Sequence, residues 1–190
     1  MKKILSFILL GATSLVASAQ ISSLDELSND KAYTIYNPFY TTYAVYNAEK
    51  STSLVWAAGM TASDKTIADQ SCTTPFNAAD PSSSWMIVPF NEQWFVYNLG
   101  AKKFMAVGHT AANSSTASAK LQDTPVAVEF TSNGNGGFHL RSYDGNQNFL
   151  CAAPQLSYPI SIWTSADNGS TWQIEENAQV QADYETCMQK

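Results

Sequence analysis

Short runs of aromatic and β-branched residues alternate with Asn, Gly, Lys and Asp along most of this chain. Paired runs begin ten or eleven residues apart in three places: Tyr33–Tyr36 with Tyr43–Tyr46, Trp94–Tyr97 with Phe104–Val107, and Phe138–Arg141 with Phe149–Ala152. Runs of this kind, bounded by turn residues, are typical of β-strands joined as hairpins. No window of 12 or more residues here keeps the i, i+3, i+4 spacing of a helix, so we predict an all-β protein.

A longer unit that contains these runs repeats three times. The segments Ala79–Ile87 and Ala166–Ile174 share the pattern Ala-Asp-x-x-Ser-(Ser/Thr)-Trp-x-Ile. Between them, Asp123–Phe130 again places an aspartate five positions before a core-type apolar residue. The aspartates are 43 and 44 residues apart, which indicates a fold built from three similar units of about 43 residues.

The repeat also assigns roles to its tryptophans and aspartates. Trp85 and Trp172 correspond to Val128 in the middle copy, and a position that accepts valine is usually a packing position, so we expect both tryptophans in the core. The repeat aspartates are expected to be turn residues that bond to their own backbone two or three positions on: Asp80, Asp123 and Asp167.

The first copy is divided between the two ends of the chain. Its Asp-to-Trp strand is Asp167–Ile174, and its next strand begins at Tyr33. A fold that ends where its first repeat begins closes on itself, which removes exposed sheet edges. We expect this closed domain to span 32–176, with an insertion of about 18 residues near 57–77.

The N-terminal segment is typical of a secretory signal peptide over 1–19. It has a positively charged start, the apolar run Ile4–Leu10, and the small residues Ala17-Ser18-Ala19 before a cleavage point at Gln20. It is too short and too polar to span a bilayer. We therefore expect a secreted or periplasmic protein without a membrane span.

Two further segments flank the predicted domain. In the N-terminal turn 20–31, Ser23 and Glu26 have the spacing of a capping box before one helical turn. Residues 177–190 are predicted to be a disordered or weakly helical tail.

Composition narrows the function classes. The net charge of −6 argues against nucleic acid as a partner, because phosphate binding needs a basic face. Two histidines and three cysteines offer little for a metal centre, so we expect no metal and no cofactor. At most one internal disulfide can form among Cys72, Cys151 and Cys187, and a 72–187 pairing is one possibility.

Signals for catalysis are sparse. His139 alternates with apolar neighbours on a predicted strand and is expected to face solvent, and His109 lies in a predicted turn. No serine lies in a nucleophile-elbow motif. We therefore predict a protein that is not an enzyme.

The threefold unit, the opening Leu27–Ile35 segment and the closing Trp172-Gln173-Ile174 strand resemble the ricin B-chain-like β-trefoil domain of secreted Bacteroidetes proteins. The resemblance covers about 32–176 and implies three pseudo-equivalent lobes, each able to carry a sugar pocket. Two features of that family are missing. Its pocket aspartate is replaced at Val45, Ala106 and Cys151, and the glutamine of its Gln-x-Trp motif is replaced at Ser83, Val126 and Ser170. Galactose binding in the manner of ricin is therefore not expected.

The resemblance also implies an aromatic residue beside each sugar pocket. Trp56 and Trp163 each end a short apolar run and are predicted to occupy comparable places, either as sugar platforms or as covers on the hairpin layer. The corresponding residue of the second copy is Ala119, so that lobe is expected to lack a platform. With Tyr46 and Asn168, the two tryptophans form our candidate ligand-binding set.

These observations favour a secreted, non-catalytic module that binds a neutral glycan through aromatic platforms on one or two lobes, since an acidic protein repels acidic ligands. Two alternatives stay open. One is a protein-interaction or inhibitor trefoil whose protein partner contacts the 57–77 loop, and the other is a fragment of a larger secreted enzyme.

Overall fold

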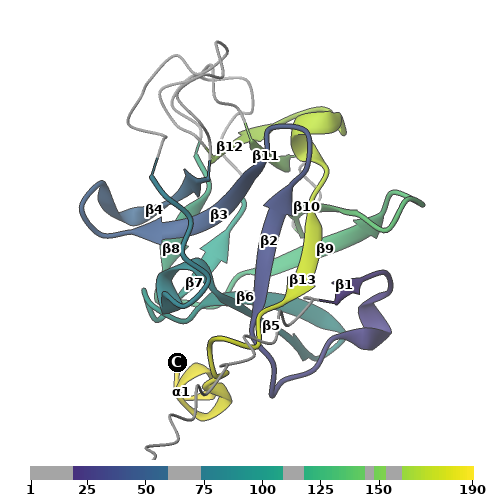
Figure 1. Cartoon of the computed structure of the whole chain (residues 1–190). Coiled ribbons are helices and arrows are strands. Elements are labelled where there is room, and N and C mark those ends of the chain that lie inside the picture. Colours follow the sequence, from purple (N-terminus) through teal and green to yellow (C-terminus); the bar gives the residue numbers. More distant parts are fainter. Residues whose placement is uncertain (1–18, 60–73, 109–117, 144–147, 153–159) are drawn as a thin grey trace, which may run out of the picture.

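The fold is all-β, as predicted (Figure 1). A computed structural model describes residues 19–59, 74–108, 118–143, 148–152 and 160–190. The predicted signal segment up to residue 18, most of the predicted 57–77 insertion, His109 and Cys72 lie outside the described residues.

The strands are short and follow one another along the chain. They are β1 (Gln20–Ile21), β2 (Tyr33–Asn37), β3 (Thr42–Asn47), β4 (Ser51–Ala58), β5 (Trp85–Phe90), β6 (Gln93–Asn98), β7 (Lys103–Ala106), β8 (Lys120–Gln122), β9 (Ala127–Ser132), β10 (Phe138–Ser142), β11 (Phe149–Ala152), β12 (Ile160–Trp163) and β13 (Gln173–Glu176). The 3-10 turns η1 (Leu24–Glu26), η3 (Pro81–Ser83) and η4 (Asn168–Ser170) and the helix α1 (Tyr184–Met188) complete the described elements.

Antiparallel pairing divides these strands into three lobes of four. The lobes are β13-β2-β3-β4, β5-β6-β7-β8 and β9-β10-β11-β12. The first lobe joins both ends of the chain, as the sequence predicts, and Figure 1 shows β13 lying beside β2.

Equivalent bridges connect successive lobes. The second strand of each lobe pairs at its start with the first strand of the next lobe: Tyr33 with Trp85, Trp94 with Val128, and Phe138 with Trp172. The fourth strands also meet, because Val55 N donates to Ala119 O and Ala119 N donates to Ile160 O. The threefold repeat of the sequence is therefore a threefold repeat of contacts.

The predicted core tryptophans are confirmed. Trp85 and Trp172 are fully buried, and their counterpart Val128 is 1% exposed. Trp85 Nε1 donates to Ala44 O and Trp172 Nε1 donates to Leu150 O, each at 2.8 Å. Each indole thus fills the centre and also satisfies a buried carbonyl of a strand in the preceding lobe.

Buried asparagines fasten two of the lobes. Asn37, fully buried at the end of β2, donates through Nδ2 to the backbone oxygens of Asn168, Gly169 and Thr171. Asn98, at the end of β6, donates in the same way to Ser82 O and Ser84 O. The third copy has a buried serine, Ser142, at this position.

The repeat aspartates behave as turn residues in two copies. Asp80 Oδ1 accepts from Ser82 N at 2.8 Å, and Asp167 Oδ1 accepts from Ser170 N at 3.0 Å. The prediction is wrong for Asp123, whose carboxylate instead lies 3.5 Å from Lys190 Nζ. No 3-10 turn precedes β9 in the described residues, so Asp123 has no such turn to cap.

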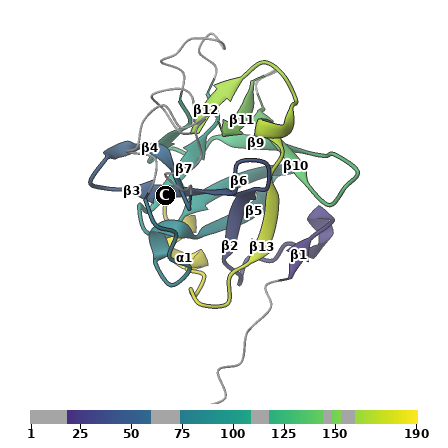
Figure 2. The same cartoon turned by 45° about the horizontal axis from the view of Figure 1, so that its top comes forward.

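The N-terminal turn is as predicted, and a short strand that was not predicted precedes it. Ser23 caps η1, and Glu26 Oε1 accepts from Ser23 N at 2.9 Å, which completes the capping box. Before it, β1 pairs with β13 (Figures 1 and 2), so the sheet begins ahead of residue 32.

The C-terminal tail is ordered, so its disordered alternative is wrong. Asn177 Nδ2 donates to Ala78 O at 2.7 Å and to Ser84 Oγ at 2.8 Å. Beyond it, α1 carries Cys187 into a second apolar cluster: Ala32, Met86, Val88, Tyr97, Leu99 and Phe104. Cys151 and Cys187 are both buried free thiols, and Cys72, the other member of the predicted 72–187 pairing, lies outside the described residues.

Candidate functional site

An open groove of about 330 Å³ lies between the β3–β4 hairpin and the η3 turn. We call it the hairpin groove. Its floor and walls include Val45, Tyr46, Asn47, Glu49, Thr74, Asn77, Asp80, Ser82 and Ser83. Segments from the first two lobes therefore meet around it.

Hydrogen bonds within these segments fix the shape of the groove. Asn47 Oδ1 accepts from the backbone N–H of Glu49 at 3.1 Å, which closes the hairpin turn, and its Nδ2 donates to Thr74 Oγ1 at 3.2 Å. On the other wall, Asp80 holds the first turn of η3 through Ser82 N. Both walls are thus held in place without a ligand.

Several polar groups in the groove have no protein partner among the described residues: the Tyr46 and Ser83 hydroxyls, Asn77 Nδ2 and the Glu49 carboxylate. Hydroxyls can donate and accept, an amide nitrogen donates, and a carboxylate accepts. The groove therefore offers both kinds of hydrogen-bonding group. The charged residues that line it, Glu49 and Asp80, are both acidic, which disfavours an anionic ligand.

Two lining positions carry the family resemblance. Val45 stands where the ricin-like pocket has its aspartate, and Ser83 stands where the Gln-x-Trp motif has its glutamine. By the resemblance, the hairpin groove includes one position of the family's sugar pocket, and the aspartate expected there is absent. Asp80 and Glu49 supply carboxylates from different positions.

Two of the four sequence-predicted site residues belong to this region. Tyr46 lines the groove and packs partly against the core. Trp56 lies directly opposite Val45 in the β3–β4 ladder, so the two side chains share one face of the hairpin. The indole Nε1 of Trp56 is buried and has no hydrogen-bond acceptor in the described structure.

The prediction that Trp56 and Trp163 occupy comparable places is wrong. Trp163 pairs with Phe149, whose counterpart in the first lobe is Tyr43, and the residue opposite Tyr43 is Ala58. Trp56 therefore lies two positions away from the true equivalent of Trp163. The ends of the apolar runs misled us because β4 continues past Trp56 to Ala58, whereas β12 ends at Trp163. Strand pairing is what defines equivalence.

The strand register also corrects which residue of the second lobe corresponds to Trp163. The residue opposite Phe104 in the β7–β8 ladder is Gln122, so Gln122 rather than Ala119 corresponds to Trp163. Ala119 is fully buried where the fourth strands of the lobes meet. Val55 and Ile160 hold the equivalent buried positions in the other two lobes.

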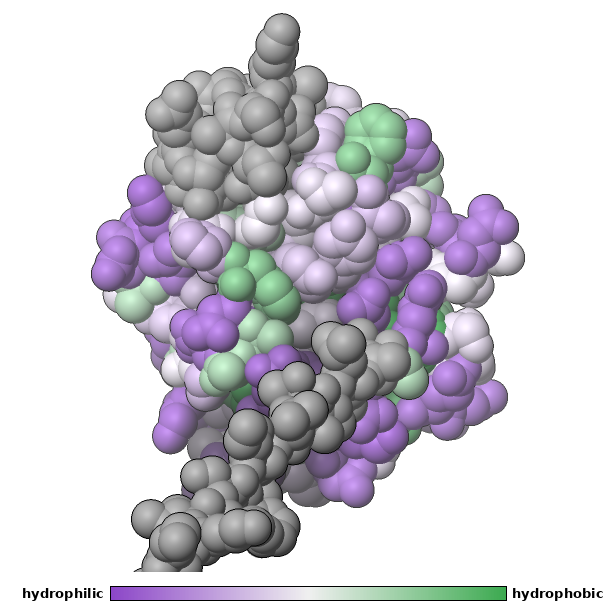
Figure 3. Space-filling model, viewed as in Figure 1, coloured by the Kyte–Doolittle hydropathy of each residue, from purple (hydrophilic) through white to green (hydrophobic). Residues whose placement is uncertain are grey.

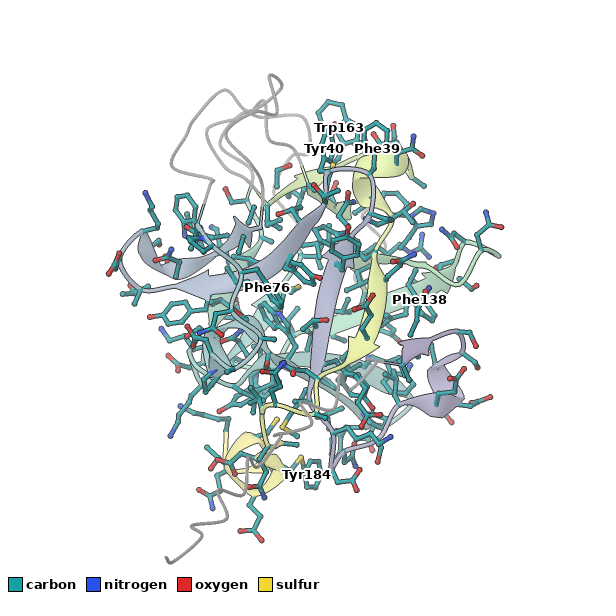
Figure 4. All side chains as sticks on the ribbon, in the orientation of Figure 1. Phe39, Tyr40, Phe76, Phe138, Trp163 and Tyr184 are labelled. Carbon is teal, nitrogen blue, oxygen red and sulfur yellow. The ribbon has the colours of Figure 1, made fainter. Side chains whose placement is uncertain are left out.

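Trp163 and Asn168 lie away from the hairpin groove. Trp163, which Figure 4 labels near the top of the molecule, is at the end of β12 and does not line the hairpin groove. Asn168 is exposed in η4 and lines a different groove. The four predicted residues therefore do not form one site.

The described histidine and the two described cysteines have structural roles. His139 is partly buried rather than solvent-facing, with Nδ1 3.0 Å from Ser170 O. Burial raises the pKa of the Cys151 and Cys187 thiols to about 11, so both are protonated and poorly nucleophilic at neutral pH. In the ranges that the structure describes, no cluster of three or more His, Cys, Asp or Glu residues could hold a metal, and no helix is long and apolar enough to cross a membrane.

Comparisons with known proteins agree on the fold. No protein-family model and no curated protein matches the sequence. Among solved structures, the chain is similar to the Macrolepiota procera ricin B-like lectin in complex with lactose, at 14% identity and a TM-score of 0.59, over 78% of this chain and 97% of that one. It is also similar to the Rhizoctonia solani agglutinin, at 13% identity and a TM-score of 0.54, over 77% and 95% of the two chains.

A third similar structure is a designed threefold-symmetric protein, ThreeFoil, at 12% identity and a TM-score of 0.54, over 76% of this chain and 97% of that one. At such identities the likeness concerns the fold alone. The chain shares the all-β architecture of the β-trefoil lectins, in line with its three four-stranded lobes.

Proposed function

We propose that this chain is an exported, non-catalytic β-trefoil module that binds a neutral glycan in the hairpin groove. The observation that carries the proposal is the position of the groove. By the resemblance it includes a position of the sugar pocket in the ricin-like family, and it presents hydroxyl, amide and carboxylate groups that have no hydrogen-bond partner among the described residues.

The chemistry of the groove fits a sugar. A pyranose needs hydrogen-bonding partners for its hydroxyls and an apolar surface for its C–H face. Tyr46 and Asn77 supply polar groups, and Trp56 stands on the same hairpin face as Val45. The acidic residues at the groove favour a neutral ligand over a sulfated or uronic one.

The non-catalytic part of the proposal is supported by the raised pKa of the two buried thiols and by the structural role of Asp80. Asp80 is engaged in capping η3 through Oδ1, so this carboxylate is held in a structural role.

The experiment is a glycan and polysaccharide array with the chain 20–190, repeated with Tyr46→Phe, Asn77→Ala and Trp56→Ala. Loss of one hydrogen bond or of the indole surface is expected to weaken binding about tenfold. Tyr143→Phe is the matched control, because Tyr143 is 52% exposed and does not line the groove.

Each variant is checked for folding by circular dichroism before binding is interpreted. An array without any neutral-glycan signal rejects the glycan proposal. Binding that persists unchanged in all three groove variants rejects the hairpin groove as its location.

A further inference from the structure

A second groove, of about 400 Å³, lies between the β2–β3 turn, the β9–β10 turn and η4. We call it the amide groove, after Asn133, Asn135, Asn168 and Gln173, which line it together with Phe39. It joins the first lobe to the third, and no residue of the hairpin groove contributes to it.

Phe39 provides an apolar platform at the rim of this groove. Its side chain is 58% exposed, the most exposed of the large apolar residues in the described structure. Figure 4 labels it at the top of the molecule, where Figure 3, in the same orientation, shows an isolated hydrophobic patch among hydrophilic and neutral residues. Single exposed apolar residues are common on protein surfaces, but this ring stands at the rim of a polar groove, where it offers an apolar face to a ligand in that groove.

The platform is held rigidly. Phe39 lies edge-to-face on Tyr40, with ring centroids 4.8 Å apart. Tyr40 N donates to Asn37 Oδ1 at 2.9 Å, and the same Asn37 side chain is bonded through Nδ2 to the backbone of η4. One buried amide therefore fixes the distance between the Phe39 turn and the Asn168 wall.

The opposite wall is fixed as well. Asn133 Oδ1 accepts from Asn135 N at 2.9 Å and from Gly137 N at 3.1 Å, which orders the β9–β10 turn. Gly136 O accepts from Gln20 Nε2 at 2.6 Å, which ties this turn to β1. A Cβ at Gly137 would lie 3.1 Å from Thr171 Cγ2, so the two walls are in close contact at this point.

The polar groups facing this fixed space are carboxamides. The side chains of Asn135, Asn168 and Gln173 have no hydrogen-bond partner among the described residues. Each carboxamide offers two donors and one acceptor, which suits vicinal hydroxyl groups. No charged residue lines the groove, so it provides no counter-ion for a charged ligand.

We infer that the amide groove is a second, independent binding site for a neutral saccharide, whose apolar face stacks on Phe39 while its hydroxyls bond to Asn168 and its neighbouring amides. This inference extends the proposed glycan-binding function to a part of the molecule outside the family's pocket position. If both sites engage one polysaccharide chain together, avidity rises by about 100-fold or more over either site.

The test follows amide chemical shifts of the 20–190 chain by NMR. The probes are neutral tetrasaccharides of gluco, galacto, manno and N-acetylgluco configuration, titrated one at a time. At least one probe is expected to shift the backbone signals of Phe39, Asn168 and Asn135. Phe39→Ala and Asn168→Ala are expected to weaken that interaction about tenfold. Phe90→Ala is the matched control, because Phe90 is 52% exposed outside the amide groove.

This experiment distinguishes a failure of the hairpin-groove site from a failure of the amide-groove site. Shifts confined to the hairpin groove and abolished by Tyr46→Phe, with none at Phe39 or Asn168, overturn the second site and leave the first. Shifts at Phe39 that survive Tyr46→Phe support the second site even if the first is absent. Equal loss of binding in Phe39→Ala and Phe90→Ala overturns the second site, because the effect would then be unspecific.

Discussion

Trp85 Nε1 lies 2.8 Å from Ala44 O, and this hydrogen bond links the second lobe to the first. Trp85→Phe removes the donor, leaves a buried carbonyl without a partner and creates a small cavity. We expect a loss of about 2–4 kcal/mol in the free energy of unfolding, measured by urea denaturation. Trp163→Phe is the control, since Trp163 is only partly buried, and should cost less than about 1 kcal/mol. Equal effects of the two substitutions would contradict the role of the indole N–H.

Asn37 should not tolerate aspartate. Its Nδ2 faces three backbone oxygens, so Asn37→Asp would place a carboxylate against three acceptors in a fully buried site. We expect a loss of about 3 kcal/mol or more in unfolding free energy at neutral pH, with partial recovery at acidic pH as the carboxyl becomes protonated. Asn135→Asp, on the exposed turn, serves as the control and should be nearly neutral. An Asn37→Asp protein with the wild-type urea midpoint would refute this account.

Stability should fall at alkaline pH because two thiols are buried. Burial raises the pKa of Cys151 and of Cys187 to about 11, above the ordinary thiol value of about 8.5. Below about pH 8.5 the two thiols are protonated in both the folded and the unfolded chain. Between about pH 8.5 and 11 the unfolded chain loses protons that the folded chain retains, so folding becomes less favourable as pH rises. We expect a loss of the order of 2 kcal/mol per thiol, measured from urea midpoints under reducing conditions. Cys187→Ala should flatten this pH dependence, and an unchanged slope would argue against the thiol as its source.

The C-terminal helix should stabilise the domain. Removing 183–190 takes Cys187 out of the cluster formed by Val88, Phe104 and their neighbours and exposes an apolar surface. We expect a loss of about 2 kcal/mol in unfolding free energy and new binding of a hydrophobic dye. Removing only the exposed residues 189–190 is the control: it breaks the surface ion pair of Lys190 with Asp123, so it should cost less than about 1 kcal/mol and leave dye binding unchanged.

The parts of the fold that depend on the repeat could be predicted from the sequence. Trp85, Val128 and Trp172 recur at nearly equal intervals, and each is buried in its lobe because the three positions face the same core. The closure of the first lobe by β13 could be predicted for the same reason, since the last copy of the motif lies at the end of the chain.

The fastening asparagines were missed although a signal was present. Both Asn37 and Asn98 follow a tyrosine at the end of a strand. The third copy has Ser142 there, so the pattern recurs only twice and does not stand out from ordinary turn composition. Their role depends on which carbonyls the neighbouring turn brings within reach, and a linear sequence does not contain that information.

The grooves could be predicted only in part. Tyr46 and Asn168 were singled out, but they line different grooves because turns from separate lobes form each one. Phe39 was missed because a phenylalanine in a run of aromatic residues suggests burial, and its exposure depends on the turn geometry set by Asn37. Likewise, the registers of β4 and β12 separate Trp56 from Trp163, which counting along the chain could not reveal.

The short strand β1 has a consequence for the order of maturation. Glu176 N donates to Ala19 O at 3.0 Å, and Gln20 pairs with Glu175. The peptide bond between Ala19 and Gln20, where we predict that the leader is cut, therefore lies within a hydrogen-bonded ladder of the finished sheet. A peptidase needs this segment extended and accessible. For a chain processed at this bond, cleavage thus comes first and docking of β1 second, and a precursor that completed its sheet early would keep its leader.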